Sequence, residues 1–259
     1  MLRAADDIGR QLEKMGLEPG RQYMDALPWM KAHPYYATER FPYEWMPRCM
    51  RYAPWHVNEG FVACHGAVKQ NTLIDIQRLW QLWSLAGEAA KSSDGAVVEV
   101  GTWRGGSGCL LAKRWQLLGK TSPVYLCDTF QGVVKVGEKD TFYKGHEHAD
   151  TSREIVEQLI EKMHLGNIKI LQGVFPDDTG NAMMARELAF CHIDVDVYQS
   201  AKDIFFFLWP RVAHGGIVVF DDYGFATTEG IRTLLDELRG RKDLIFFAGL
   251  SGQGMLIKK

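Results

Sequence analysis

Five short apolar runs that alternate with helix-like segments constrain the fold of this chain more than any other feature. The runs are AVVEVG (96–101), PVYLCD (123–128), IKILQG (168–173), LAFCHID (188–194) and GIVVFDD (216–222). Segments long enough for crossover helices lie between or beside them, at 105–119, 150–165 and 198–212. Strand, helix, strand at this spacing predicts a parallel sheet that is covered by helices on both faces.

The C-terminal end of the chain shows a different pattern. LIFFAG (244–249) and GMLIKK (254–259) are apolar runs joined by a Gly/Ser turn, which is typical of an antiparallel pair. Before the first predicted strand, residues 71–91 carry apolar side chains at helical spacing. The predicted fold class is therefore α/β, with a doubly wound, mostly parallel sheet, a terminal antiparallel hairpin and an N-terminal helical or irregular extension.

The first 70 residues differ in composition from the rest. Ten of the 30 aromatic residues fall between Tyr23 and Phe61, and six of the nine prolines lie before residue 55. Proline lacks a backbone donor and fixes its own φ, so the stretch 24–60 is not expected to form a regular helix or sheet. We expect an extension over 1–70, which serves as a dimer contact or as the lid or wall of a substrate pocket. The α/β domain would span 71–259.

Charge and composition exclude several classes of partner. The 30 Lys and Arg residues are balanced by 32 Asp and Glu residues, which leaves no positive field for a nucleic acid. No apolar run approaches the roughly 20 residues of a membrane helix, and the first 16 residues lack the apolar segment of a signal peptide. The five cysteines form no CxxC pair, as expected for reduced packing residues. These features predict a cytoplasmic protein with a small-molecule partner.

A glycine-rich turn, EVGTWRGGSG (99–108), follows the first predicted strand. Glycines allow a ligand to approach the backbone, and the following helix offers free N–H groups. The spacing differs from the G-x-G-x-x-G of dinucleotide sites, and Glu99 suits a ligand with an ammonium group. Asp128, which ends the second strand, is placed to accept both hydroxyls of a ribose. Together these features indicate S-adenosylmethionine, with NAD or a tight turn beside a capping Asp as alternatives.

Two acid pairs follow the fourth and fifth predicted strands. Asp194 and Asp196 end one strand, and Asp221 and Asp222 end the other. Carboxyl ends of parallel strands meet at one edge of the sheet, so these acids should crowd together and raise each other's pKa above about 3.9. A shared proton or a divalent cation would relieve the repulsion, and three carboxylates suit Mg²⁺ or Mn²⁺. The alternative is that either pair serves only as helix caps or turn residues.

Several sequence blocks match a known family. VVEVGTWRGGSG (97–108) resembles the V-E-T-G-V-W-R-G-G signature of the macrocin O-methyltransferase family (TylF/MycF type). CDTFQG, GVFPDDT, HIDVDVYQSAKD and GGIVVFDDYG resemble its later blocks in the same order, and the match spans about 70–258. The resemblance implies a class I methyltransferase sheet and an S-adenosylmethionine-binding domain over 71–259. It also implies Mg²⁺-dependent methyl transfer to a sugar hydroxyl of a glycosylated natural product.

The resemblance assigns roles by position. Asp194, Asp221 and Asp222 would hold Mg²⁺ (or Mn²⁺), and Asp196 would be the general base. The methionine and ribose parts of the cofactor would be lined by Glu99, Gly101, Thr102, Gly105, Ser107 and Asp128. Phe175 and Asp177 would lie near the adenine. We also expect a homo-oligomer, with neither a nucleic acid nor a membrane as partner.

Other residues remain open from the sequence. The polar segment 133–152 is expected to be a mobile lid that keeps water out. Its Tyr143, His146 and His148 are candidates for contacts with the acceptor. His192 lies in an apolar strand and is expected to be a hydrogen-bonded core residue. Two other functions are compatible with the pattern: methylation of a catechol-like phenol, and cofactor binding without turnover in a partner subunit.

Overall fold

The computed structural model describes residues 52–184 and 186–259. The chain divides into two compact units, Met1–Pro54 and Trp55–Lys259. The second unit carries all the strands and α-helices discussed below, and the predictions made for the extension before residue 52 lie outside the described residues. In the described part of the chain, we find no helix with the length and apolar character needed to cross a membrane.

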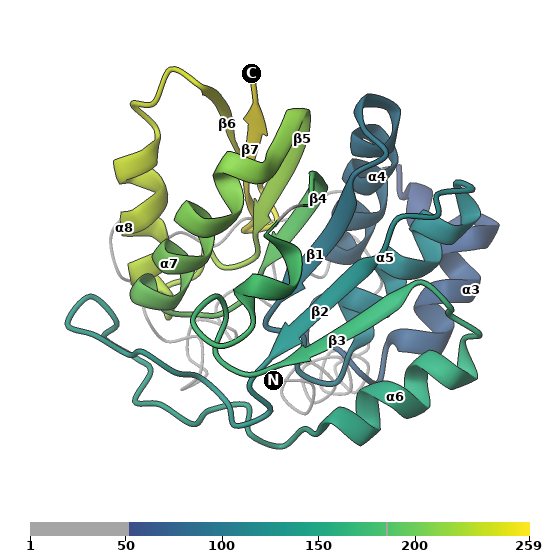
Figure 1. Cartoon of the computed structure of the whole chain (residues 1–259), viewed down its shortest axis with the longest axis horizontal. Coiled ribbons are helices and arrows are strands. Elements are labelled where there is room, and N and C mark those ends of the chain that lie inside the picture. The colour runs from purple at the N-terminus through teal and green to yellow at the C-terminus, as the bar shows by residue number, and fades with distance from the viewer. Residues whose placement is uncertain (1–51, 185) are drawn as a thin grey trace, which may run out of the picture. The chain divides into compact units, whose positions relative to one another are not determined.

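A seven-stranded sheet forms the centre of the second unit (Figure 1). Its strands are β1 Ala96–Val100, β2 Val124–Asp128, β3 Ile168–Gln172, β4 Leu188–Ile193, β5 Val212–Phe220, β6 Leu244–Ala248 and β7 Gly254–Lys258. Their order across the sheet is β3-β2-β1-β4-β5-β7-β6. β1 to β5 are parallel, whereas β7 is antiparallel to both β5 and β6. The order reverses at β1, so β1 and β4 flank the point where ligands bind in such sheets.

Helices cover both faces of the sheet (Figure 1). One face packs against α3 Glu59–Val68, α4 Ile76–Ser92, α5 Gly106–Leu117 and α6 Arg153–Lys162. The other packs against α7 Tyr198–Leu208 and α8 Glu229–Leu238. Short 3-10 helices occupy Pro54–His56, Gly180–Met183 and Trp209–Arg211. Because β strands alternate their side chains between faces, β1 to β5 and β7 contribute apolar residues to both cores, whereas β6 contributes only to the core beside α7 and α8.

Local sequence explains where the helices begin. Asp75 caps α4 by accepting hydrogen bonds from the backbone N–H groups of Gln77 and Arg78, and Ser152 caps α6 through the N–H of Ile155. Such caps satisfy donors that have no partner within the helix. The helices then present apolar stripes to the sheet, as α8 does with Ile231, Leu234, Leu235 and Leu238.

The fold predicted from the sequence is confirmed, with three differences in detail. All five parallel strands and the terminal hairpin are present. Within that hairpin the last strand, β7, lies beside β5, so β6 becomes the edge strand. The prediction also omitted α8, although its apolar residues have helical spacing, and α3 already begins at Glu59 inside the stretch that was expected to be irregular.

Candidate active site at the carboxyl edge of the sheet

The glycine turn joins β1 to α5 at the carboxyl edge of the sheet. Gly101 and Gly105 have φ values of +91° and +84°, a region that favours glycine. A Cβ atom on Gly101 would lie 1.7 Å from the backbone oxygen of Asp194. Gly101 is therefore required because the chain after β4 crosses directly above it, which brings the turn against the first acid of the predicted cluster.

Glu99 lies beneath this turn and is fully buried. Its Oε2 accepts a hydrogen bond from Thr102 Oγ1 at 2.6 Å, and its Oε1 lies 2.9 Å from Nδ1 of His192. A Cβ atom on Gly108 would come within 2.4 Å of Glu99 Oε2, so the start of α5 closes over the carboxylate. The carboxylate has no exposed surface in this structure, so the role of Glu99 toward the ammonium group of a ligand stays a prediction.

Asp128 ties the turn to the end of β2. One carboxylate oxygen accepts from the N–H of Trp103 and the other from the N–H of Phe130, both at 2.7 Å. Burial raises the pKa of Asp128 above its usual value, and these backbone hydrogen bonds oppose the increase. The acid predicted to bind the ribose is thus already held in a fixed orientation by the backbone.

The remaining residues predicted to bind the cofactor lie in different surroundings. Ser107 is buried in the first turn of α5. Phe175 is also buried, and its ring packs edge-on against Phe207 with 5.3 Å between centroids. Asp177 forms an ion pair with Lys135 at 2.8 Å. In residues 52–184 and 186–259 we find no contact that joins Phe175 or Asp177 to the glycine turn, so their place beside the adenine stays a prediction.

The structure brings three predicted metal ligands together. Asp194 directly follows β4, and Asp221 and Asp222 directly follow β5. Because Ile193 and Phe220 are neighbours in the parallel β4–β5 ladder, the next residues of both strands emerge side by side. One carboxylate oxygen from each acid lies within 4.8 Å of those of the other two.

The three acids differ in how their charge is compensated. Asp221 forms an ion pair with Arg78 of α4 and accepts a hydrogen bond from Gln253 Nε2 at 2.6 Å. Burial opposes ionisation of Asp221, but these partners and His192 hold its pKa below the usual value. Burial and the neighbouring carboxylates instead raise the pKa of Asp194 and Asp222 well above theirs.

Asp196 lies beside the cluster in a left-handed turn, with a φ of +64°. Its N–H donates to Asp222 Oδ2 at 3.2 Å, and its Oδ1 accepts a hydrogen bond of 2.5 Å from the Tyr143 hydroxyl. His148 Nε2 is 3.9 Å from its Oδ2. Burial raises the pKa of Asp196 above the usual value. A fourth acid is thus available next to the three clustered ones, in contact with the segment expected to be a lid.

That segment, 133–152, is attached to α7 and α8. The carboxylate of Asp140 accepts from the N–H of Tyr198 at 2.9 Å, and Lys139 pairs with Glu237 at 2.8 Å. His146 lies apart from the acids, with its Nδ1 3.3 Å from the carbonyl oxygen of Gln131. The segment therefore has defined anchoring points, and its mobility stays a prediction.

Two residues that contact Asp221, Arg78 and Gln253, were not predicted from the sequence. Arg78 shares the buried face of α4 with Leu82 and Ala86, one and two helical turns further on. A charge within an apolar helical stripe is a signal that could have identified it. Gln253 precedes β7 in a Gly/Ser turn, and nothing in that local pattern points to Asp221, which lies 32 residues away.

His192 is a buried, hydrogen-bonded residue of β4, as predicted. Its imidazole has no exposed surface and lies between Glu99 and Asp221. Burial disfavours the charged imidazole, but the two carboxylates outweigh this effect and raise the pKa of His192 to about 10.

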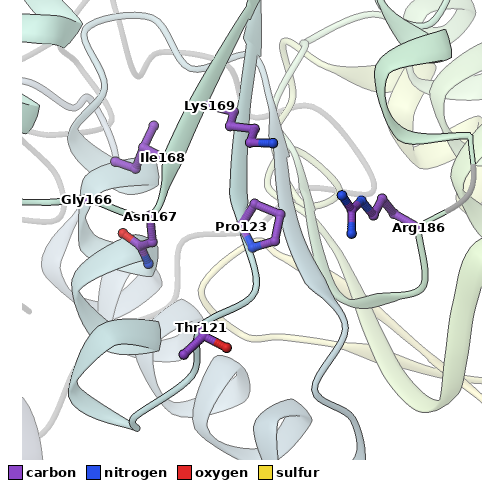
Figure 2. A pocket seen from close by; sticks show the side chains of 7 residues that line it. All are labelled: Thr121, Pro123, Gly166, Asn167, Ile168, Lys169 and Arg186. Atoms are coloured by element: carbon purple, nitrogen blue, oxygen red, sulfur yellow. The ribbon is translucent and has the colours of Figure 1, made fainter.

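A separate pocket of about 250 Å³ lies at the opposite edge of the sheet (Figure 2). It is lined by Thr121, Pro123, Gly166, Asn167, Ile168, Lys169 and Arg186. These residues lie at or before the amino ends of β2, β3 and β4, whereas the acids follow the carboxyl ends of β4 and β5. The pocket is therefore not part of the acid cluster.

Several known proteins resemble this chain in sequence. A family model described as Macrocin-O-methyltransferase (TylF) matches residues 66–245. The chain is 31% identical over 182 residues to 8-demethyl-8-(2,3-dimethoxy-alpha-L-rhamnosyl)-tetracenomycin-C 4'-O-methyltransferase of Streptomyces olivaceus, covering 66% of this chain and 68% of the relative. It is 30% identical to Mycinamicin III 3''-O-methyltransferase of Micromonospora griseorubida, covering 59% and 65%.

A solved structure gives the same result for the fold. The O-methyltransferase NovP superposes with a TM-score of 0.63 at 25% identity, covering 73% of this chain and 82% of NovP. The family match spans more than half of the chain and contains the glycine turn and both acid pairs. S-adenosylmethionine is the methyl donor that such membership implies. The chain therefore belongs to the macrocin O-methyltransferase (TylF) family and is an O-methyltransferase.

Proposed function

We propose that this protein transfers a methyl group from S-adenosylmethionine to a sugar hydroxyl of a small glycosylated natural product, with the help of Mg²⁺ (or Mn²⁺). The observation that supports it most is the convergence of Asp194, Asp221 and Asp222 on one point, with Asp196 beside them. A homo-oligomeric state and a cytoplasmic location belong to the same proposal and remain predictions.

The acid cluster fits a divalent cation on chemical grounds. Its ligands are carboxylate oxygens, which Mg²⁺ and Mn²⁺ prefer. Across residues 52–184 and 186–259, no side chain donates a hydrogen bond to Asp194, and Asp222 accepts only the Asp196 N–H at its carboxylate. Asp194, which is half-buried, and Asp222, which is buried, thus lack the direct ion pair and side-chain hydrogen bond that Asp221 has. When bound, a cation supplies positive charge that stabilises negative charge on an acceptor oxygen, an effect worth several kcal/mol.

The protein's own residues perform the remaining tasks in this proposal. Glu99 binds the ammonium group of the donor and Asp128 binds its ribose, while the glycine turn accepts its carboxylate at the start of α5. Methyl transfer needs the acceptor oxygen about 3 Å from the methyl carbon and in line with sulfur. Asp196 takes the proton of the acceptor hydroxyl, a contribution of roughly 10²- to 10⁴-fold. Tyr143 holds Asp196 in place through its hydrogen bond.

The names of relatives support a glycosylated acceptor. One relative is named for a rhamnosyl-tetracenomycin and another for mycinamicin III. A third, 29% identical over 188 residues, is Demethyldecarbamoylnovobiocin O-methyltransferase of Streptomyces niveus. The inference to this chain concerns the class of acceptor, a hydroxyl-bearing sugar on a larger scaffold, and not any one compound.

The proposal is tested by measuring methyl transfer from labelled S-adenosylmethionine to glycosylated natural products and to simple catechols, with Mg²⁺ or with EDTA. We expect transfer to a glycosylated acceptor, loss of activity in EDTA and recovery with excess Mg²⁺. Transfer to catechols alone would show that the acceptor is a phenol and not a sugar hydroxyl. Full activity in EDTA would show that methyl transfer does not need a divalent cation.

A further inference from the structure

Three buried polar side chains form a row on one face of the sheet. Glu99 of β1 and His192 of β4 are direct neighbours in the parallel ladder, and His192 pairs with Val219 of β5. Side chains two residues apart on a strand share a face, so Asp221, just after β5, continues on the face of Val219. The row therefore runs from the glycine turn to the acid cluster through the imidazole of His192.

The contacts within this row are direct. His192 Nδ1 lies 2.9 Å from Glu99 Oε1, and its Nε2 lies 3.5 Å from Asp221 Oδ1. All three side chains are 0–1% exposed, so water does not separate them. The shorter contact is a hydrogen bond, whereas the longer one leaves Nε2 without a well-formed partner in the described part of the chain. A small movement of Asp221 toward the imidazole would complete the row.

Each end of the row belongs to a different half of the proposed site. At one end, Thr102 and the start of α5 enclose Glu99. At the other end, Arg78 pairs with Asp221 Oδ2, and Gln253 donates to Oδ1, the oxygen that also faces His192. The imidazole is thus the direct link between a carboxylate assigned to the methyl donor and a carboxylate assigned to the cation.

We propose that His192 is a positioning residue that couples the two halves of the site, so that a divalent cation at the acid cluster and the methyl donor at the glycine turn each strengthen binding of the other. This inference rests on the proposed function. A cation fixes Asp221, which completes the contact to His192 Nε2 and holds the imidazole and Glu99 in one arrangement. A carboxylate that is already oriented loses less freedom when the ligand binds. Linkage requires the effect to be equal in both directions.

The test measures binding rather than turnover. Isothermal titration with S-adenosylhomocysteine gives its Kd for the full chain with saturating Mg²⁺ and with EDTA. We expect Mg²⁺ to tighten binding about fivefold or more in the wild type, as in ordinary coupling between sites. A wild-type ratio near one overturns the proposal, whatever the variants do.

Two variants identify the residue responsible. In His192→Asn, the amide can replace the Nδ1 contact to Glu99 but is too short to reach Asp221. We expect this variant to bind S-adenosylhomocysteine in EDTA nearly as well as the wild type, with the Mg²⁺ effect reduced to a ratio near one. As a control, Ser200→Ala removes a buried hydrogen-bonding side chain that lies outside the row. This variant should keep the wild-type ratio of Kd values between EDTA and Mg²⁺. Coupling that persists in His192→Asn overturns the role of His192.

Direct titration with Mn²⁺, followed by electron paramagnetic resonance, separates this inference from the proposed function. Mn²⁺ binding that is lost in Asp222→Asn supports the metal site, and the coupling ratio then decides the role of His192. If Mn²⁺ does not bind to the wild type, the metal site and the coupling both fail. Should His192→Asn prove unfolded by circular dichroism, His192→Gln, which can reach Asp221 but not retain the Nδ1 contact, provides the same test.

Discussion

The glycine turn and the acid cluster lie at the same edge of the sheet, but their carboxylates are held in different ways. Asp128 and Glu99 each have hydrogen-bond donors on both oxygens, from the backbone, Thr102 and His192. Asp194 and Asp222 have raised pKa values because they are buried among like charges. The carboxylates at the turn are therefore held by the protein's own hydrogen-bond donors. The carboxylates of Asp194 and Asp222 are instead suited to the positive charge of a bound cation.

The largest loss of activity is expected when an acid of the cluster, Asp222, is replaced. Asp222→Asn removes a proposed cation ligand, so we expect kcat/KM to fall about 10³-fold, since several kcal/mol are lost at about 1.4 kcal/mol per decade. The same substitution removes an uncompensated buried charge, so in EDTA the variant should melt higher than the wild type. Glu88→Gln, on the surface of α4, is the control for a lost carboxylate. A lower melting temperature in EDTA would show that the charge of Asp222 is already compensated.

The next effect concerns Asp196, the acid between the cluster and the lid segment. Asp196→Asn should bind S-adenosylhomocysteine and Mg²⁺ as the wild type does but turn over at least about 100-fold more slowly, because the acceptor proton loses its base. Tyr143→Phe keeps the base and removes only its hydrogen-bond donor, so its loss should be smaller. Turnover of Asp196→Asn at the wild-type rate would exclude Asp196 as the base.

The third prediction concerns the stability of the metal-free protein at different pH. Asp194 and Asp222 have folded-state pKa values above the unfolded value of about 3.9. Their contribution to stability is therefore complete below that pH and is lost as pH rises through the folded-state values. Asp221, whose pKa is lowered, acts in the opposite sense, and its contribution is already complete above the unfolded value, so it does not change over this range of pH.

A cation that binds only the folded state counters this loss. We expect the difference in melting temperature between Mg²⁺ and EDTA to grow from pH 5 to pH 8. The double variant Asp194→Asn/Asp222→Asn should show almost no such growth. If the difference in melting temperature stays constant with pH in the wild type, ionisation of Asp194 and Asp222 does not destabilise the metal-free protein.

The smallest change is expected at Thr102, whose hydroxyl donates a hydrogen bond to Glu99 at the glycine turn. Thr102→Val leaves one oxygen of buried Glu99 without its hydroxyl donor, which should cost about 1–3 kcal/mol of unfolding free energy. Binding of Mg²⁺ in the absence of the methyl donor should change by less than the stability does, because Thr102 reaches the cluster acids only through Glu99 and His192. Urea unfolding and Mg²⁺ titration measure the two effects. If Thr102→Val weakens Mg²⁺ binding by as much free energy as it lowers stability, the glycine turn and the acid cluster are not held in different ways.

Much of this architecture could be predicted from the sequence, because the relevant signals are local. Apolar runs identified the strands, and acids that end adjacent parallel strands must meet at one edge, as Asp194 and Asp221 do. The contacts that compensate Asp221 are not local. Arg78 lies 143 residues away on α4, and Gln253 reaches the site only because β7 inserts beside β5. The hydrogen bond between Tyr143 and Asp196 likewise depends on the path of an irregular segment.

The most direct test of the metal site is a crystal of the protein grown with Mn²⁺ and S-adenosylhomocysteine, measured for anomalous scattering. We expect one strong peak bonded to oxygens of Asp194, Asp221 and Asp222, on the side of the cluster that faces the bound cofactor. The absence of a peak at these acids, or a peak at another place only, would contradict the proposed metal site.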